Sequence, residues 1–251
     1  MKDKKLNIIV FVPTIGRGGA EQSILRLSGN FLEKGHNVLL IVAKRVKDEG
    51  HVPKGLVIRS LDKKRTIFSI LKFKKIVIKI QPDIVLSTLP TTNFINVLVS
   101  KIIKLSYKSY VRVASSNFLM WSGSIKKNIF GIMGRYTFKN AHGVIFISKE
   151  LSELMNHKVS EIINNKRIIY NPIVTRDFFK KADEKITLPK EYREKEMWVI
   201  GSNLQKHKGI DLLIDAVKEL RNDREFVLFV LGTGKRMDYL KRKVLDYQSF
   251  I

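Results

Sequence analysis

Short apolar runs alternate with helix-period patterns along most of the chain. A run such as Leu6–Val12 (LNIIVFV) is apolar at nearly every position, which is typical of a strand buried on both faces of a parallel sheet. The pattern predicts strands over 6–12, 37–43, 56–60, 84–88, 109–114, 143–147 and 167–170. It predicts helices over 20–34, 66–80, 93–105, 125–139 and 149–164. This alternation indicates an α/β fold with helices on both faces of a parallel sheet.

The alternation pauses after Asn171 and then restarts. The intervening segment holds two prolines and many charges with weak periodicity, so it is predicted to be a linker. Beyond it, strands are expected over 197–201 and 226–231 and helices over 209–220 and 237–247. We therefore predict an N-terminal domain at 1–171, a linker at 172–196 and a partial C-terminal domain at 197–251. The unpaired sheet edge of so small a segment predicts poor solubility or marginal stability.

A glycine-rich turn follows the first predicted strand. Gly16, Gly18 and Gly19 permit a tight turn and the close approach of a ligand, and a helical pattern begins near Glu21. Backbone N–H groups at a helix N-terminus attract anions, so a phosphate or a sugar is one expected ligand. The order G-x-G-G differs from the dinucleotide fingerprint G-x-G-x-x-G. An ordinary strand-to-helix turn without a ligand is the alternative.

The charge is strongly positive and unevenly distributed. The chain has 251 residues, no cysteine and a formal net charge of +24, and no acidic residue lies between Asp83 and Glu150. The lack of cysteine excludes disulfides, thiolate metal sites and a cysteine nucleophile. A field of one sign repels itself unless an anionic partner screens it. Candidate partners are therefore an anionic membrane surface, nucleic acid or a polyanionic substrate.

The segment 66–80 favours a membrane surface among these partners. Its helical pattern predicts an apolar side of Ile67, Ile70, Leu71, Val77 and Ile78. A basic side of Lys72, Lys75 and Lys79 lies next to it, with Phe68 and Phe73 at the boundary. Such a pattern suits an anionic membrane, although a solvated lysine face is the alternative. We expect no nucleic-acid partner, because no recognisable nucleic-acid motif is present.

No apolar run approaches the roughly 20 residues of a transmembrane helix. The N-terminus MKDKK lacks a convincing signal peptide. We therefore expect a cytoplasmic protein that associates peripherally with the inner face of the cell membrane.

Six sequence landmarks occur in order along the chain. They are GGAE at 18–21, PDIVLS at 82–87, GVIFIS at 143–148, IIYNPI at 168–173, SNLQKHKGIDLLIDAV at 202–217 and LGTG at 231–234. This set resembles the family-four glycosyltransferases of the GT-B fold. The resemblance implies a retaining enzyme built from two Rossmann-like domains, which bind the acceptor and the nucleotide-sugar donor respectively across a cleft.

The resemblance also implies site residues. Gly18, Gly19 and Glu21 match the loop that approaches the donor phosphate and the acceptor. Lys208 and Gly209 match a KG pair whose lysine contacts the donor pyrophosphate, where a cation stabilises the leaving group. Asn171 matches the asparagine of the hinge motif, and the following residue is proline where glycine is usual.

Two positions depart from the pattern of the family. Asn203 stands where arginine is frequent, and it lacks the arginine fork. Ser115, Ser116 or Asn117 lines the position at which a histidine is frequent, and Ser116 and Asn117 are the candidate site residues there. We assign no catalytic residue and expect no metal site and no tightly bound cofactor.

The acidic motif that binds the donor sugar in the family is absent from this sequence. The resemblance therefore indicates a truncated C-terminal domain. The main functional expectation is sugar transfer from a nucleotide sugar to a lipid-linked or polysaccharide acceptor in cell-surface glycan biosynthesis. The alternatives are a catalytically inactive fragment or binding module and, less favoured, a basic nucleic-acid-binding protein.

Overall fold

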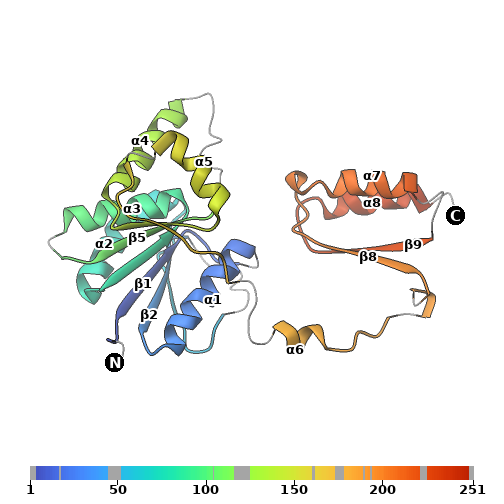
Figure 1. Ribbon diagram of the computed structural model, residues 1–251, viewed down its shortest axis with the longest axis horizontal. Coiled ribbons are helices and arrows are strands. Elements are labelled where there is room, and N and C mark those ends of the chain that lie inside the picture. The colour runs from blue at the N-terminus through green and yellow to red at the C-terminus, as the bar shows by residue number, and fades with distance from the viewer. Residues whose placement is uncertain are drawn as a thin grey trace. The chain divides into compact units, whose positions relative to one another are not determined.

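The computed structural model describes residues 4–16, 18–44, 52–103, 105–115, 125–159, 162–172, 178–188, 190–192, 194–220 and 225–248 (Figure 1). It forms two compact units, residues 1–175 and 176–251. Two short helical segments, α6 (Phe178–Ala182) and the 3-10 turn at Lys190–Tyr192, precede the strands of the second unit.

The first unit is built on one parallel sheet of seven strands in the order β3-β2-β1-β4-β5-β6-β7. The strands are β1 (Asn7–Val12), β2 (Asn37–Val42), β3 (Val57–Ser60), β4 (Ile84–Thr88), β5 (Lys108–Val113), β6 (Gly143–Phe146) and β7 (Lys166–Ile168). Every neighbouring pair runs parallel, with Ile8 opposite both Val38 and Ile84 at the centre. The predicted parallel sheet is thus confirmed, because long apolar runs suit strands covered on both faces.

Helices cover both faces of this sheet. They are α1 (Gly19–Glu33), α2 (Ile70–Ile80), α3 (Pro90–Ile102), α4 (Ile125–Asn140) and α5 (Lys149–Val159). α3 begins three residues earlier than expected because Pro90 fits the first turn of a helix, where its missing N–H costs nothing. The expected helix 149–164 ends at Val159, and β7 has begun by Lys166.

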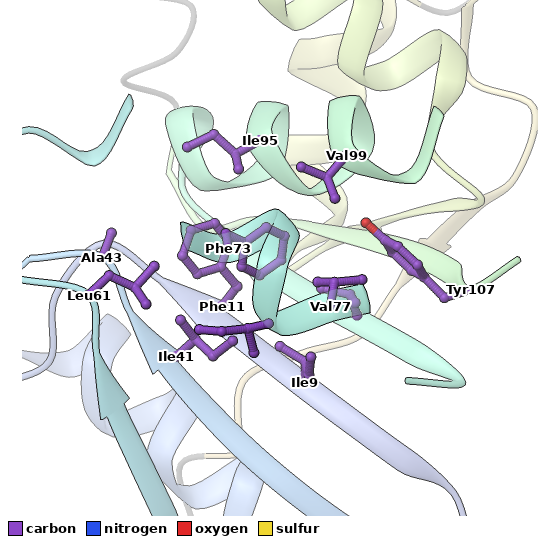
Figure 2. Packing of buried hydrophobic residues seen from close by; sticks show 12 residues of the cluster. Ile9, Phe11, Ile41, Ala43, Leu61, Phe73, Val77, Ile95, Val99 and Tyr107 are labelled. Atoms are coloured by element: carbon purple, nitrogen blue, oxygen red, sulfur yellow. The ribbon is translucent and has the colours of Figure 1, made fainter. Parts of the chain in front are cut away.

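Alternate residues of β1 enter different cores, as the period of a strand requires. Ile9 and Phe11 pack with α2 and α3, whereas Ile8 and Val10 pack with α1. In the first of these cores, the rings of Phe11 and Phe73 stack with their centroids 4.1 Å apart (Figure 2). Fully burying one such side chain stabilises the fold by about 1.5–3 kcal/mol.

The orientation predicted for helix 66–80 is wrong in part. Residues Thr66–Ser69 form a 3-10 turn, and the α-helix begins only at Ile70. Its buried side consists of Phe73, Ile76 and Val77, while Leu71 is 72% exposed and Ile78 is also exposed. The tighter 3-10 turn has three residues per turn instead of 3.6 and therefore changes the phase of the pattern.

The second unit contains a parallel pair of strands, β8 (Glu196–Gly201) and β9 (Phe226–Leu231). α7 (Ile210–Leu220) and α8 (Met237–Gln248) follow these strands in turn. Its small core joins Leu204, Ile210, Ile214 and Leu240. The strands and helices expected here are present with bounds that shift by one residue at most.

Candidate functional site

The carboxyl end of the seven-stranded sheet contains a topological switch point. The chain leaves β1 toward β2 on one side and returns through β4 on the other, so the loops after β1 and β4 diverge there. Ligands of open α/β sheets bind in the crevice at such a point. The glycine turn follows β1 and Leu89 follows β4, which makes this edge the candidate site of the first unit.

The glycine turn is held by its own side chains. Gly18 is the N-cap of α1 in an extended conformation, and a Cβ atom at this position would overlap Oε2 of Glu21. The Glu21 carboxylate therefore folds back over Gly18. Gln22 donates from Nε2 to the Gly16 carbonyl oxygen at 2.8 Å. By contrast, a Cβ at Gly19 would meet no atom within 4 Å.

This arrangement changes the chemistry expected of the turn. Negative side chains are favourable in the first turn of a helix, and Glu21 is acidic and lies in that turn. The turn thus carries its own carboxylate, which accepts hydrogen bonds. It suits a ligand that offers hydroxyl groups better than a bare anion.

Leu89 marks local strain at the same edge. It precedes α3 with φ of 73° and ψ of 150°. A positive φ is disfavoured for a residue with a Cβ and costs on the order of 1–3 kcal/mol. Strain of this kind persists where the surrounding structure enforces it, and it clusters at functional sites.

Arg112 is a component of this edge that the sequence did not reveal. It is the penultimate residue of β5, is only 5% exposed, and donates to Thr88 Oγ1 and Ser23 Oγ, each at 3.2 Å. Its third bond goes from Nη2 to Asn171 Oδ1 at 2.5 Å. All three acceptors are neutral, and burial lowers the pKa of the guanidinium. Among the described residues, Arg112 is thus a buried cation without a carboxylate partner, which is unusual.

Arg112 brings together elements that are far apart in the sequence. Ser23 belongs to α1, Thr88 ends β4 and Asn171 follows β7. The asparagine assigned to the hinge motif is thus anchored to the first unit. The only signal for Arg112 in the sequence is a basic residue at the end of a strand within a stretch free of acidic residues.

Ser116 and Asn117, which were predicted to line the cleft, lie outside the described residues. Their assignment stays a prediction.

In the second unit, the loops after β8 and β9 run side by side. Ser202 N–H donates to the Leu231 carbonyl and Leu204 N–H to the Thr233 carbonyl, both at 2.9 Å. A Cβ at Gly232 would overlap the Ser202 carbonyl oxygen, and one at Gly234 would overlap that of Leu204. Only glycine fits at these two positions, so the LGTG turn is needed for this close approach of backbones.

The KG pair lies at the start of α7. Lys208 ends a 3-10 turn (Lys206–Lys208), and Gly209 takes the left-handed conformation with φ of 67° before the helix begins at Ile210. The side chains of Asn203 and Lys208 are exposed. Within the described part of the chain, the Lys208 ammonium has no hydrogen bond or ion pair and remains available to an anion.

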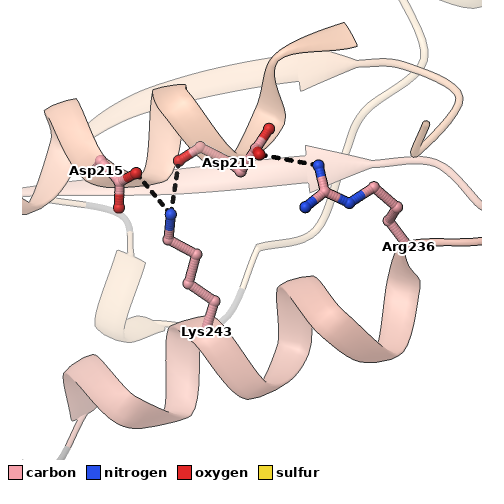
Figure 3. Close-up of polar contacts among 4 residues, drawn as sticks. All are labelled: Asp211, Asp215, Arg236 and Lys243. Atoms are coloured by element: carbon pink, nitrogen blue, oxygen red, sulfur yellow. Dashed lines mark hydrogen bonds and ion pairs between the residues drawn. The ribbon is translucent and has the colours of Figure 1, made fainter. Parts of the chain in front are cut away.

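Two ion pairs fix α7 against α8 (Figure 3). Arg236 donates to Asp211 at 2.8 Å, and Lys243 pairs with Asp215 at 2.6 Å. The hydrogen bond from Arg236 lowers the pKa of the Asp211 carboxyl. Asp211 lies in the first turn of α7, and its charge is balanced by Arg236. The Asp211 carboxylate is thus already paired, and it does not neutralise Lys208 at this helix start.

The described ranges hold no group of three or more His, Asp or Glu side chains placed to bind a metal ion.

The family of the chain follows from comparison with known proteins. A model described as Glycosyltransferase Family 4 matches residues 17–177, more than half of the chain. The chain belongs to glycosyltransferase family 4. The matched residues include Gly18 and Gly19 of the glycine turn, Arg112 and Asn171. The match confirms the family resemblance of the sequence. A search of curated proteins found no match.

Solved glycosyltransferase structures share the fold of the chain. Sucrose-phosphate synthase from Thermosynechococcus elongatus aligns with a TM-score of 0.67 at 12% identity over 96% of this chain. Anabaena Alr3699/HepE in complex with UDP gives 0.66 at 13% identity over 97%. A glycosyltransferase from Rickettsia africae gives 0.62 at 15% identity over 98%. At these identities the likeness establishes the fold alone, and it confirms the predicted GT-B architecture.

The chain spans about two thirds of these structures, namely 68%, 66% and 65% of their respective lengths.

Proposed function

We propose that this family 4 member transfers a sugar from a nucleotide-sugar donor to a lipid-linked or polysaccharide acceptor, with retention, in cell-surface glycan biosynthesis. The family match over residues 17–177 is the observation that carries the proposal. Retention and the type of acceptor are carried over from the family resemblance. The complex of Anabaena Alr3699/HepE with UDP-glucose supports a nucleotide sugar as donor.

We assign the donor diphosphate to the start of α7. The exposed ammonium of Lys208 and the N-terminus of α7 are both electropositive, and the left-handed Gly209 joins them. A cation at this position stabilises the negative charge that develops on the leaving diphosphate. Asn203 offers a neutral amide where an arginine is frequent in the family, so Lys208 supplies the larger share of this stabilisation.

We assign acceptor hydroxyl groups to the glycine turn. The Glu21 carboxylate is a hydrogen-bond acceptor next to Gly18 and Gly19, where no Cβ atom obstructs a ligand. Ser116 and Asn117 complete this side of the site in our proposal.

The exposed side of α2 supports association with an anionic membrane. This side and the 3-10 turn before it together carry three large apolar and three basic side chains: Phe68 in the turn, and Leu71, Lys72, Lys75, Ile78 and Lys79 on α2. Apolar side chains beside lysines suit the interface of an anionic bilayer, and each lysine contributes about 1 kcal/mol of attraction near its surface. The net charge of +24 also favours binding to an anionic surface.

None of the helices in the described ranges combines the length and apolar character needed to cross a bilayer.

A transfer assay tests the proposed activity. The chain is incubated with a panel of radiolabelled nucleotide sugars and a membrane fraction that supplies acceptors, and labelled glycan is counted. We expect one donor to be used, and we expect Lys208→Ala to reduce transfer at least tenfold. Lys206→Ala removes an exposed lysine from the same turn and should leave transfer within twofold. Donor binding without transfer would favour a binding module instead.

A further inference from the structure

Cationic residues gather at the carboxyl ends of β2 and β3, near the start of the glycine turn. The backbones of three segments are joined there, because Lys44 N–H donates to the Pro13 carbonyl and Lys63 N–H to the Ala43 carbonyl, both at 3.0 Å. Neighbouring strands are about 4.8 Å apart, which puts the Lys63 backbone roughly 10 Å from Pro13. Neither the family resemblance nor the proposed donor and acceptor contacts assign these cations a role.

The segment after β3 presents its cations without a carboxylate to pair them. Asp62 takes a left-handed conformation with φ of 51°, which Asp tolerates better than most residues. Its Oδ1 accepts a hydrogen bond from the Ser60 hydroxyl at 2.8 Å, and the following segment 63–80 has no acidic residue. Within the described part of the chain, no ion pair is formed by the three cations that follow Asp62, namely Lys63, Lys64 and Arg65.

Lys72 of α2 reaches the same segment. Its Nζ donates to the Leu61 carbonyl oxygen at 3.1 Å, which uses one of the three N–H donors of the ammonium. This contact ties the basic side of α2 to the start of the cationic segment. Phe68 is 60% exposed and Leu71 is 72% exposed, and both lie between Arg65 and Lys72 in the sequence. Cations and exposed apolar side chains are therefore neighbours on this surface.

This combination limits the ligand. Clustered cations without carboxylate partners attract an anion, and Lys and Arg side chains are the usual protein groups that bind phosphate. A small soluble anion would gain nothing from Phe68 and Leu71. A ligand that joins a phosphate to an aliphatic chain uses both the cations and the apolar side chains.

We propose that this basic cluster binds the phosphate or diphosphate group of a lipid-linked acceptor, whose aliphatic chain contacts Phe68 and Leu71. The glycine turn, the cations and the apolar side chains then take the sugar hydroxyl, the phosphate and the lipid in the order in which such a molecule presents them. The inference rests on the proposed function and deepens it, since it names an anionic lipid as the class of acceptor. The cluster consists of Lys44, Lys63, Lys64, Arg65 and Lys72.

Binding of small phosphates to the full chain tests this site. The chain carries Lys208→Ala, so that the diphosphate site proposed at α7 does not contribute. Calorimetry measures octyl phosphate, octyl glucoside as the analogue without an anion, and inorganic phosphate as the anion without a chain, each below any critical micelle concentration. We expect saturable binding of octyl phosphate. Each of the other two compounds should bind at least tenfold more weakly, because it lacks either the charge-assisted hydrogen bonds or the apolar contact.

Two double variants separate this cluster from the net charge, since each removes two exposed cations. Lys64→Ala with Arg65→Ala should weaken octyl phosphate binding at least tenfold. Lys101→Ala with Lys108→Ala should leave it within twofold, because Lys101 lies in the last turn of α3 and Lys108 begins β5, at the amino end of the sheet. Phe68→Ser should weaken the binding of octyl phosphate but not that of inorganic phosphate.

Three results would overturn the lipid-phosphate site: no saturable binding of octyl phosphate, equal affinity for octyl phosphate and either analogue, or equal losses in the two double variants. Sugar transfer to the acceptors of a membrane fraction is measured in parallel on the chain with Lys208 intact. Transfer without octyl phosphate binding defeats this inference alone. Octyl phosphate binding without transfer defeats the proposed function and leaves a lipid-phosphate binding site.

Discussion

Arg112 Nη2 donates to Asn171 Oδ1 at 2.5 Å, and this contact joins the end of β5 to the segment after β7. The two residues are 59 positions apart in the sequence. Their hydrogen bond fixes the last residues of the first unit to the same polar cluster that holds Ser23 of α1. Arg112 is therefore a positioning residue in our interpretation, because it orients the asparagine at the hinge position.

We expect Arg112→Met to reduce transfer more than stability. The substitution removes a buried charge that has no carboxylate partner in the described part of the chain, and with it the cost of holding that charge away from water. The free energy of unfolding should change by less than about 1 kcal/mol, while transfer falls at least tenfold. Urea denaturation and the transfer assay measure the two effects.

Arg112→Lys serves as the control, because it keeps the charge but loses the fork that reaches three acceptors. A loss of more than about 3 kcal/mol in Arg112→Met, the cost of breaking a buried charged network, would show that the residue acts on folding instead.

Gly18 and Gly19 should respond oppositely to alanine. Gly18→Ala forces the Glu21 carboxylate away from its position, because a Cβ there overlaps Oε2. Gly19→Ala meets open space at the first position of α1. Since alanine has a higher helix propensity than glycine by up to ~1 kcal/mol, Gly19→Ala should not destabilise the protein. Gly18→Ala should destabilise it by on the order of 1 kcal/mol.

Chemical denaturation of both variants measures this difference. Equal effects of the two substitutions on stability would mean that the position of the Glu21 carboxylate does not depend on the lack of a side chain at Gly18.

The sequence was sufficient for the order of strands and helices, since central strands such as β1 and β2 are nearly continuous apolar runs and the helices have apolar residues at helical spacing. It failed at positions that depend on tertiary context. The burial of Arg112 was missed because its three partners lie in α1, β4 and the segment after β7. The exposure of Leu71 was missed because the 3-10 turn at Thr66–Ser69 changes the helical phase. The sequence predicts the glycine turn, but it does not predict that the Glu21 carboxylate folds back over Gly18.

The exposed side of α2 gives a prediction about membranes. Leu71→Glu places a negative charge among apolar and basic side chains that we assign to the bilayer interface. We expect it to reduce sedimentation with anionic vesicles at least fivefold and to leave stability unchanged, since the side chain is exposed. Vesicles of phosphatidylglycerol and phosphatidylcholine measure the effect, with pure phosphatidylcholine as the neutral reference.

Leu212→Glu is a matched control for this experiment. Leu212 lies on α7 of the second unit and is 72% exposed, the same fraction as Leu71. If both variants lose binding equally, net charge alone drives the association. Equal sedimentation of the unaltered chain with neutral and anionic vesicles would contradict a role for the basic side chains.

The lowered pKa of Asp211 predicts how the stability of the second unit changes at acid pH. Its pKa is lowered in the folded state, first by the hydrogen bond from Arg236, so its folded pKa lies below the ordinary value of about 3.9. The stabilisation of the folded state by the Asp211–Arg236 pair is therefore fully present at pH values above the ordinary pKa of an Asp carboxyl. It is lost as the pH falls toward the folded pKa, because protonation of the carboxylate removes the ion pair.

Asp211→Asn should remove this acid-dependent loss and make the unit less stable at neutral pH. Fluorescence of Trp198, which stacks on Phe226 with centroids 4.6 Å apart, reports unfolding of this unit between pH 6 and about pH 2.5, a range chosen to bracket the ordinary Asp value. Asp238→Asn on α8 is the control, since its carboxylate has no partner in the described part of the chain. A pH profile of Asp211→Asn that overlays the profile of the unaltered chain would contradict the role of the Asp211–Arg236 pair.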